Sequence, residues 1–256
     1  MKQKINRIGE QKKNKYGNVM TIVEYNSAKS VIVEFENGYK TEVQYGNFKK
    51  GNISNPYDKS IYNVGYVGEG EYKVFENGSR TVEYKYWYSM LNRCYGKLYH
   101  EDKPTYEDKY VCEEWYNFQN FAKWFNENYY EVDGDKMCLD KDILFKGNKI
   151  YSPDTCVFVP NRINNLFTKR QNDRGEYPIG VYYHKSKFNS QCSIYDEFNK
   201  KYKQKHLGTF DTPEEAFHKY KKFKEQYIKE VAEEYKDLIP TKLYEAMCKY
   251  VVEIND

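Results

Sequence analysis

The sequence predicts an α+β protein that is built from several small domains. Three observations carry this prediction: strand-like segments near the N-terminus, aromatic residues at helical spacing in the middle, and further strands followed by a capped helix. Apolar residues make up 39% of the 256 residues and charged residues 31%, which favours modules with thin cores. The 29 tyrosines supply part of the missing apolar surface, because the tyrosine ring packs well while its hydroxyl stays polar.

Residues 1–78 are expected to form a small β-barrel of the SH3 or Tudor type. The stretches "VMTIVEY" (19–25) and "SVIVEFENGYKTEVQY" (30–45) are rich in β-formers, and the second contains the hairpin signal Asn37-Gly38. Residues 51–72 are dense in Gly and Asn, which indicates tight turns. Lysines in 10–17 and 47–51 either grip nucleic acid or only keep the domain soluble, and the sequence leaves both readings open.

Residues 79–170 are expected to contain two amphipathic helices, over 82–95 and 112–129. Trp87, Leu91, Trp115 and Phe121 are among the large side chains that recur there at spacings of three and four residues. Core packing explains these aromatic residues better than a binding site does.

Residues 171–256 are expected to form a three-stranded sheet over 179–210, followed by a helix over 212–238. Thr212 is a good N-cap, Pro213 suits the first helical position and Glu215 completes a capping box. Pro240 ends this helix, and a short helix is expected to follow it. Residues 168–178 are polar and serve as the linker.

The charge and the cysteine content limit the kinds of function that the protein can have. The net charge of +3 excludes a uniformly basic surface but allows local basic stripes. The chain has no apolar run near 18 residues and no secretory signal, which favours a soluble protein of the cytoplasm without a membrane partner. The six cysteines lack any C-x-x-C pair, so buried reduced thiols are favoured over a zinc site.

Four stretches within residues 87–165 resemble, in order, the His-Me finger (HNH) nucleases of phages: "WYSMLNRCY", "YVCEEWYNFQNFAKW", "LDKDI" and "GNKIYSPDTCVFVPNRINNL". The resemblance implies a ββα unit around one divalent cation, Mg or Mn. It also implies that the protein acts in the cytoplasm of a bacterial host cell. By position, it makes Asp140 a metal ligand, places Lys141 where the general base is a histidine, and places Thr155 where a second ligand is usually Asn.

The two departures from the family pattern, at Lys141 and Thr155, weigh against catalysis. A general base must be neutral near pH 7, which suits histidine, whereas the ordinary pKa of lysine is about 10.4. Lys141 could instead stabilise a phosphate transition state electrostatically, while threonine is a weak ligand for a hard cation. The sequence therefore favours a nuclease fold that has lost its chemistry, and an active endonuclease or nickase remains the alternative.

Residues from Gly180 to about Phe223 resemble the Apetala/ethylene-response-factor DNA-binding domain, through "GVYYHKSKF" and "HLGTFDTPEEAFHKY". The resemblance implies a sheet that lies in the major groove of double-stranded DNA, with a helix packed behind it. Ten residues are carried over as DNA contacts: Tyr182, His184, Lys185, Lys187, Phe188, Gln191, Ser193, Tyr195, Lys203 and Lys205. Lysine grips phosphate more than it distinguishes bases, so loose sequence specificity is expected.

Three functions remain open from sequence. The first is a DNA-binding protein of phage or mobile-element type, with a regulatory or anti-host-defence role. The second is a metal-dependent HNH endonuclease. The third is an inhibitor that binds a host or phage protein through its tyrosine-rich surface.

Overall fold

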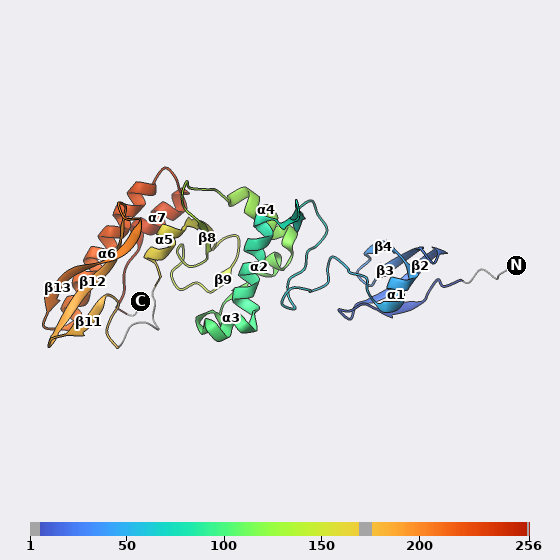
Figure 1. The fold of residues 1–256 in the computed structure, drawn as a ribbon, viewed down its shortest axis with the longest axis horizontal. Coiled ribbons are helices and arrows are strands. Elements are labelled where there is room, and N and C mark those ends of the chain that lie inside the picture. The colour runs from blue at the N-terminus through green and yellow to red at the C-terminus, as the bar shows by residue number, and fades with distance from the viewer. Residues whose placement is uncertain (1–5, 169–175, 255) are drawn as a thin grey trace. The chain divides into compact units, whose positions relative to one another are not determined.

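The computed structural model describes residues 6–168, 176–254 and 256, in which helices and sheets are mixed (Figure 1). The chain divides into two compact units: residues 1–127 with 150–152, and residues 128–149 with 153–256. The fold is therefore α+β, as predicted. The division into domains 1–78, 79–170 and 171–256 remains a prediction.

The N-terminal strands form an open antiparallel sheet in the order β1-β2-β3-β4. Its elements are β1 (Gln11–Lys13), β2 (Val19–Ser27), β3 (Ser30–Phe35), β4 (Lys40–Val43) and, directly after it, the short helix α1 (Tyr45–Lys50). The predicted hairpin is confirmed, with Gly38 at a positive φ in its turn. No sheet in the described part of the chain closes into a barrel, so the predicted barrel is wrong. The chain turns into α1 after β4, and β4 stays at the edge of the sheet.

Apolar side chains on one side of this sheet form its core. Met20, Ile22, Val31, Val33 and Phe35 are fully or almost fully buried there, because alternate residues of a strand point to the same side. Two residues beyond the sheet complete the cluster: Phe48 and Ile53.

The first unit continues with aromatic helices. Its remaining elements are β5 (Phe75–Glu76), β6 (Ser79–Arg80), α2 (Val82–Tyr95), α3 (Lys97–Asp102), the 3-10 turns η1 (Pro104–Tyr106) and η2 (Glu113–Tyr116), β7 (Tyr110–Val111), α4 (Phe118–Asn128) and β9 (Ile150–Tyr151). The prediction of a helix over 82–95 is confirmed. The second predicted helix is interrupted at Asn117, whose side chain accepts a hydrogen bond from the Gln119 amide and so starts α4 anew.

The second unit contains a short antiparallel strand pair, a three-stranded sheet and three helices. Its elements are β8 (Met137–Asp140), β10 (Val157–Pro160), α5 (Asn161–Leu166), β11 (Val181–His184), β12 (Lys187–Asp196), β13 (Lys201–Phe210), α6 (Pro213–Tyr235) and α7 (Thr241–Lys249). The predicted cap of α6 is confirmed, since the Thr212 hydroxyl accepts a hydrogen bond from the Glu215 amide. The helix ends at Tyr235, five residues before Pro240, and Pro240 instead precedes α7.

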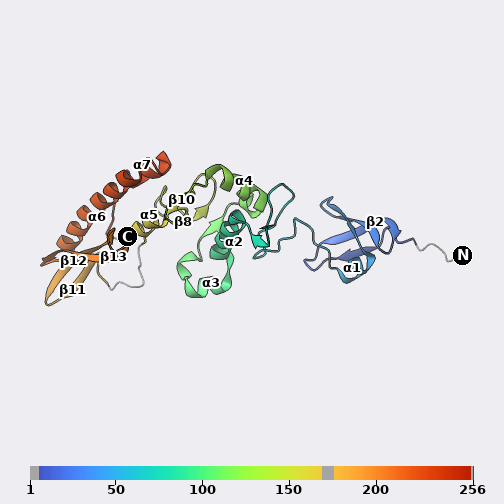
Figure 2. The ribbon, with the colours of Figure 1, turned by 45° about the horizontal axis from the view of Figure 1, so that its top comes forward.

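Helix α6 belongs to two hydrophobic cores. Its first half, with Ala216, Phe217 and Tyr220, packs with Val181 and Cys192 of the sheet β11–β13. Its second half packs against β10, α5 and α7, and contributes the side chains Ile228, Val231, Ala232 and Tyr235. Figures 1 and 2 both show α6 lying along the sheet. The sheet and the β8–β10 strand pair are thus connected through one helix.

Within the described residues, no helix has the length and apolar character that crossing a membrane requires.

Candidate nucleic-acid interface

The three-stranded sheet β11–β13 has one side packed on α6 and one side turned away from it. Cys192 is buried in the core with α6, and alternation along β12 puts Phe188, Ser190 and Ile194 on that same side. Strand pairing puts Asn189, Gln191, Ser193 and Tyr195 on the opposite side, which we call the open face. Neighbouring strands add to the open face the side chains Tyr182, His184, Lys187, Tyr202, Gln204, His206 and Thr209.

A β-bulge decides which residues of β13 reach the open face. Ser190 pairs with Gly208, but the next residue, Gln191, pairs with His206, so Leu207 is an extra residue in β13. One extra residue reverses the side to which the side chains beyond it point, here those of residues 201–206 relative to residues 208–210. Leu207 itself packs on the core with α6.

Six of the ten predicted contact residues lie on the open face: Tyr182, His184, Lys187, Gln191, Ser193 and Tyr195. Lys185 lies in the turn between β11 and β12 with a positive φ. Phe188, Lys203 and Lys205 lie on the other side. The Lys205 ammonium sits 4.7 Å from the ring centroid of Phe223 on α6, and Lys203 is paired with Asp196 at 2.9 Å. These three do not share a face with Gln191 and Ser193, and their contact with DNA remains a prediction.

One end of the open face is already occupied by α5. The Arg162 guanidinium lies 5.2 Å from the ring centroid of Tyr195, and the Asn165 amide donates a hydrogen bond to the Tyr202 hydroxyl at 3.2 Å. The sequence did not indicate these contacts. The accessible part of the face is therefore centred on Gln191 and Ser193, with Gln204 and His206 beside them.

A hydrogen bond and an ion pair hold some of the polar side chains of the open face in place. The Thr209 hydroxyl donates a hydrogen bond to Asn189 at 2.8 Å across the strands. Lys187 forms an ion pair with Asp211. The sequence analysis selected Gln191 and Ser193 but missed Gln204 and His206. It missed these two because only the bulge brings them to the open face.

The β8–β10 pair carries the residues that the nuclease resemblance singles out. Two antiparallel strands followed by α5 give the strand–strand–helix order that the resemblance implies, while membership of that fold remains a prediction. Asp140 ends β8 and pairs with Val157 of β10. One oxygen of its carboxylate accepts hydrogen bonds from the amides of Asp142 at 2.9 Å and Ile143 at 2.7 Å. Burial, and then the nearby charge of Asp142, raises the pKa of Asp140 to about 6.

Lys141 is almost completely buried, with 5% of its surface exposed. Its ammonium group donates to a carboxylate oxygen of Asp142 at 3.1 Å. The Asp142 side chain is about half exposed, so the Lys141 ammonium forms the inner end of an ion pair that reaches the surface. Lys141 is therefore directed at a carboxylate, and no histidine stands at the position of the general base.

A divalent cation fits this donor set poorly. Mg and Mn prefer several oxygen ligands, at least one or two of them carboxylates. Here one oxygen of Asp140 already accepts two amide hydrogens, Thr155 offers only a hydroxyl from the turn before β10, and a buried ammonium lies next in sequence. Among the described residues, no group of three or more His, Cys, Asp or Glu side chains is placed to hold a metal ion.

No family model, curated protein or solved structure matches the chain. The family resemblances therefore remain predictions. The function has to be inferred from the arrangement of the residues.

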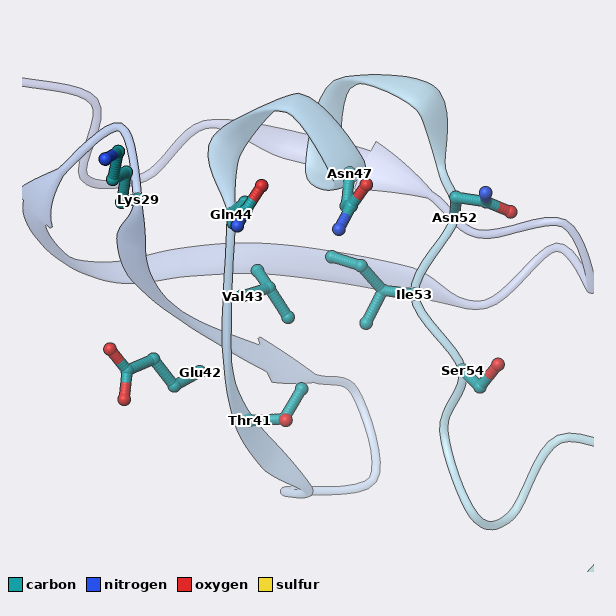
Figure 3. Close-up of a pocket in the computed structure, with 9 residues that line it drawn as sticks. All are labelled: Lys29, Thr41, Glu42, Val43, Gln44, Asn47, Asn52, Ile53 and Ser54. Atoms are coloured by element: carbon teal, nitrogen blue, oxygen red, sulfur yellow. The ribbon is translucent and has the colours of Figure 1, made fainter.

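The N-terminal sheet carries a separate polar groove of about 500 Å³ (Figure 3). Its walls are the free edge of β4 and the extended segment 52–54, and Val43 and Ile53 point toward each other between them. The lining residues are Lys29, Thr41, Glu42, Val43, Gln44, Asn47, Asn52, Ile53 and Ser54. An edge strand presents unpaired backbone groups, which is the feature that an added peptide strand uses.

Proposed function

We propose that this protein is a DNA-binding protein of phage or mobile-element type, which holds duplex DNA on the open face of the β11–β13 sheet. One observation carries the proposal: one face of this sheet packs on α6, and the other presents hydrogen-bonding side chains at two-residue spacing. A strand pair or sheet of this size can enter the major groove of DNA.

The chemistry of the open face suits base edges and backbone together. Gln191 and Gln204 carry amides that both donate and accept, which is what a base edge requires. Lys185 lies in the β11–β12 turn at one end of the same sheet, where a cation can contact phosphate oxygens, and Lys187 beside it is paired with Asp211. The open face has no arginine, so the proposal includes loose specificity and a large electrostatic contribution to affinity.

The β8–β10 unit serves in this proposal as a scaffold that no longer cuts DNA. The ion pair of Lys141 with Asp142 supports this role, because it leaves the expected base position occupied by a cation. Asp140 supports it too, because its carboxylate caps the turn that contains Lys141.

The proposal is tested by a mobility-shift titration of the full chain with a pool of random duplexes, at several salt concentrations. We expect binding without any divalent cation, weakening about linearly in log affinity against log salt, because bound phosphates release counterions. Ser193→Glu should weaken binding about tenfold, because a carboxylate on the open face repels phosphate. Binding that is insensitive to both salt and Ser193→Glu would refute the proposal.

An active nuclease is the alternative for the same unit. Incubating supercoiled plasmid with Mg or Mn tests it, beside the Lys141→His and Asp140→Ala variants. We expect no cleavage by the wild-type protein. Nicking by the wild type that disappears in Asp140→Ala would establish the alternative, and cutting by Lys141→His alone would identify the lysine as what silences the site.

A second candidate function is capture of a partner protein in the groove beside β4. The free edge of β4 favours it, and the occupant would be an extended peptide that pairs with this edge. The backbone amide of Glu42 points to the free edge, because Thr41 and Val43 are the residues of β4 that pair by hydrogen bonds with β3, and Glu42→Pro removes that amide. If a partner isolated from phage-infected cells binds wild type and Glu42→Pro equally, while both fold, this candidate is excluded.

A further inference from the structure

The hairpin of β12 and β13 extends well beyond the rest of its sheet. Strand β11 pairs only with residues 187–190 of β12, whereas β12 and β13 stay paired as far as Asp196 and Lys201. The hairpin therefore continues as a two-stranded arm, which touches α6 and α5 through Tyr195 and Tyr202 and ends in the four-residue turn 197–200.

Phe198 lies in this turn with 94% of its surface exposed. No other large apolar side chain of the described residues is as exposed. Isolated surface apolar residues are common, but a phenylalanine left almost wholly in water at the end of an arm is not explained by the fold.

The turn that presents Phe198 is held in one conformation by Asp196. Its carboxylate accepts hydrogen bonds from the amides of Phe198 at 3.1 Å and Asn199 at 3.2 Å, and from the Asn199 side chain at 3.1 Å. The Lys203 ammonium donates to the same carboxylate at 2.9 Å. This hydrogen bond, followed by those from Asn199, holds the pKa of Asp196 well below its usual range.

The charges around Phe198 leave a positive tip. Both acidic residues beside it are neutralised, Asp196 by Lys203 and Glu197 by Arg162 at 2.7 Å. Lys200 and Lys201 follow in the turn and the start of β13, are exposed, and have no ion pair in the described part of the structure. An exposed ring beside cations on a fixed turn suits nucleic acid, because the ring can stack on a base while the cations contact the neighbouring phosphates.

We propose that Phe198 is a stacking wedge, which inserts beside a base of bound DNA when the open face of the sheet engages the duplex. This inference rests on the proposed DNA-binding function and adds a mode of contact that the function does not require. Wedge side chains that unstack a base step are apolar, and the phenyl ring adds a π face on which any base can stack.

The test uses duplexes with 2-aminopurine at their centre, either fully paired or beside a mismatch, where unstacking costs less. The fluorescence of 2-aminopurine rises when the base loses its stacked neighbours. Wild-type protein should raise the fluorescence severalfold, more strongly beside the mismatch. Phe198→Ala should abolish most of that rise and weaken binding roughly threefold to tenfold, while the salt dependence stays unchanged because no phosphate contact is removed.

Two further variants make the result specific. Phe198→Trp should retain the fluorescence rise, because the indole ring also stacks. Phe145→Ala removes another exposed aromatic residue, in the loop after β8, and should leave the rise unchanged. Thermal melts of each variant check that the fold is kept.

The outcomes separate the wedge from the proposed function. If wild type and Phe198→Ala both bind and raise the fluorescence equally, the wedge is refuted and DNA binding stands. If the wild type does not bind any duplex, both fail. If it binds vesicles of anionic phospholipid instead, in a manner lost in Phe198→Ala, the ring serves a membrane surface and the wedge is refuted.

Discussion

The sheets β1–β4 and β11–β13 are built alike and present different outward sides. Each is antiparallel and buries apolar residues on one side, the first under Phe48 and Ile53 and the second under α6. On the outward side of the first sheet the side chains include Glu24, Glu34 and Glu42, with Lys40 paired to Glu34 at 3.6 Å. The outward side of the second sheet carries amides, hydroxyls and imidazoles.

The comparison teaches that the apolar pattern decides which side of a sheet is buried, and the other residues decide what the exposed side can bind. Three carboxylates against the ammonium groups of Lys40 and Lys13 leave this side acidic, which disfavours a phosphate backbone, whereas uncharged hydrogen-bonding groups near lysines do not. Lys12 does not alter this, because it pairs with Met20 and so lies on the core side of the first sheet.

The largest expected effect concerns the core of the first sheet. Ile22 is fully buried, so Ile22→Ala should lower the free energy of unfolding by about 2–4 kcal/mol through lost apolar contact and a residual cavity. Urea denaturation followed by circular dichroism measures it. A loss below about 1 kcal/mol would show that this core collapses around the missing atoms.

The next effect concerns a buried cation beneath the second sheet. Lys224 of α6 is 8% exposed, and burial lowers its pKa. No carboxylate in the described residues forms an ion pair with it, so Lys224→Met should stabilise the protein by about 1–3 kcal/mol in urea denaturation at pH 7. Stability of the wild type should rise with pH toward the ordinary lysine pKa, because the neutral amine is favoured in the fold. An unchanged or lower stability of Lys224→Met would contradict this.

A matched pair of variants compares the two outward sides directly. Ser193→Glu and Thr21→Glu each replace a hydroxyl on the outward side of a strand with a carboxylate. The first should weaken DNA binding about tenfold, which corresponds to about 1.4 kcal/mol, and the second should change it less than twofold. Fluorescence anisotropy with a labelled duplex at moderate salt measures both. Equal effects would assign DNA binding to both sheets or to neither.

The smallest effect concerns the hairpin turn at acid pH. The pKa of Asp196 is lowered in the fold, so the stability that its hydrogen bonds add is complete above the ordinary pKa of about 3.9 and is lost progressively as the pH falls from there through the lowered pKa. A carboxyl NMR titration should show Asp196 titrating below this value. Lys203→Ala should move the titration upward, while Lys201→Ala, which removes a neighbour without that hydrogen bond, should move it little. Equal shifts in both variants would indicate general charge rather than the hydrogen bond.

The sequence predicts the strands of both sheets, although the first sheet is open and not a barrel. It does not predict which side of a strand faces the core where apolar and polar residues do not alternate. The hairpin at Asn37-Gly38 and the cap at Thr212 depend on neighbouring residues alone, so they can be recognised locally. The side to which β13 points could not be predicted, because residues 201–206 are all polar or aromatic and have no apolar alternation. The bulge at Leu207 then sends Lys203 and Lys205 to the side of α6.

Longer-range contacts explain the other differences. The covering of Tyr195 and Tyr202 by α5 joins segments more than thirty residues apart, which no local pattern reports. The open form of the first sheet depends on where the chain goes after β4. The ion pair of Lys141 with Asp142 is local, but the burial of Lys141 depends on the packing of Ile143 and β10 in the core with α6.

The membership of α6 in two cores has a consequence for how this protein can be divided. A fragment that starts at residue 171 keeps the whole helix but loses β10 and α5, which cover Ile228, Val231 and Ala232. Such a fragment would expose an apolar stripe and should aggregate or recruit another chain. The sheet therefore cannot be exchanged as a self-contained cassette, and a recombination event that moved it intact would have to carry β8, β10 and α5 along.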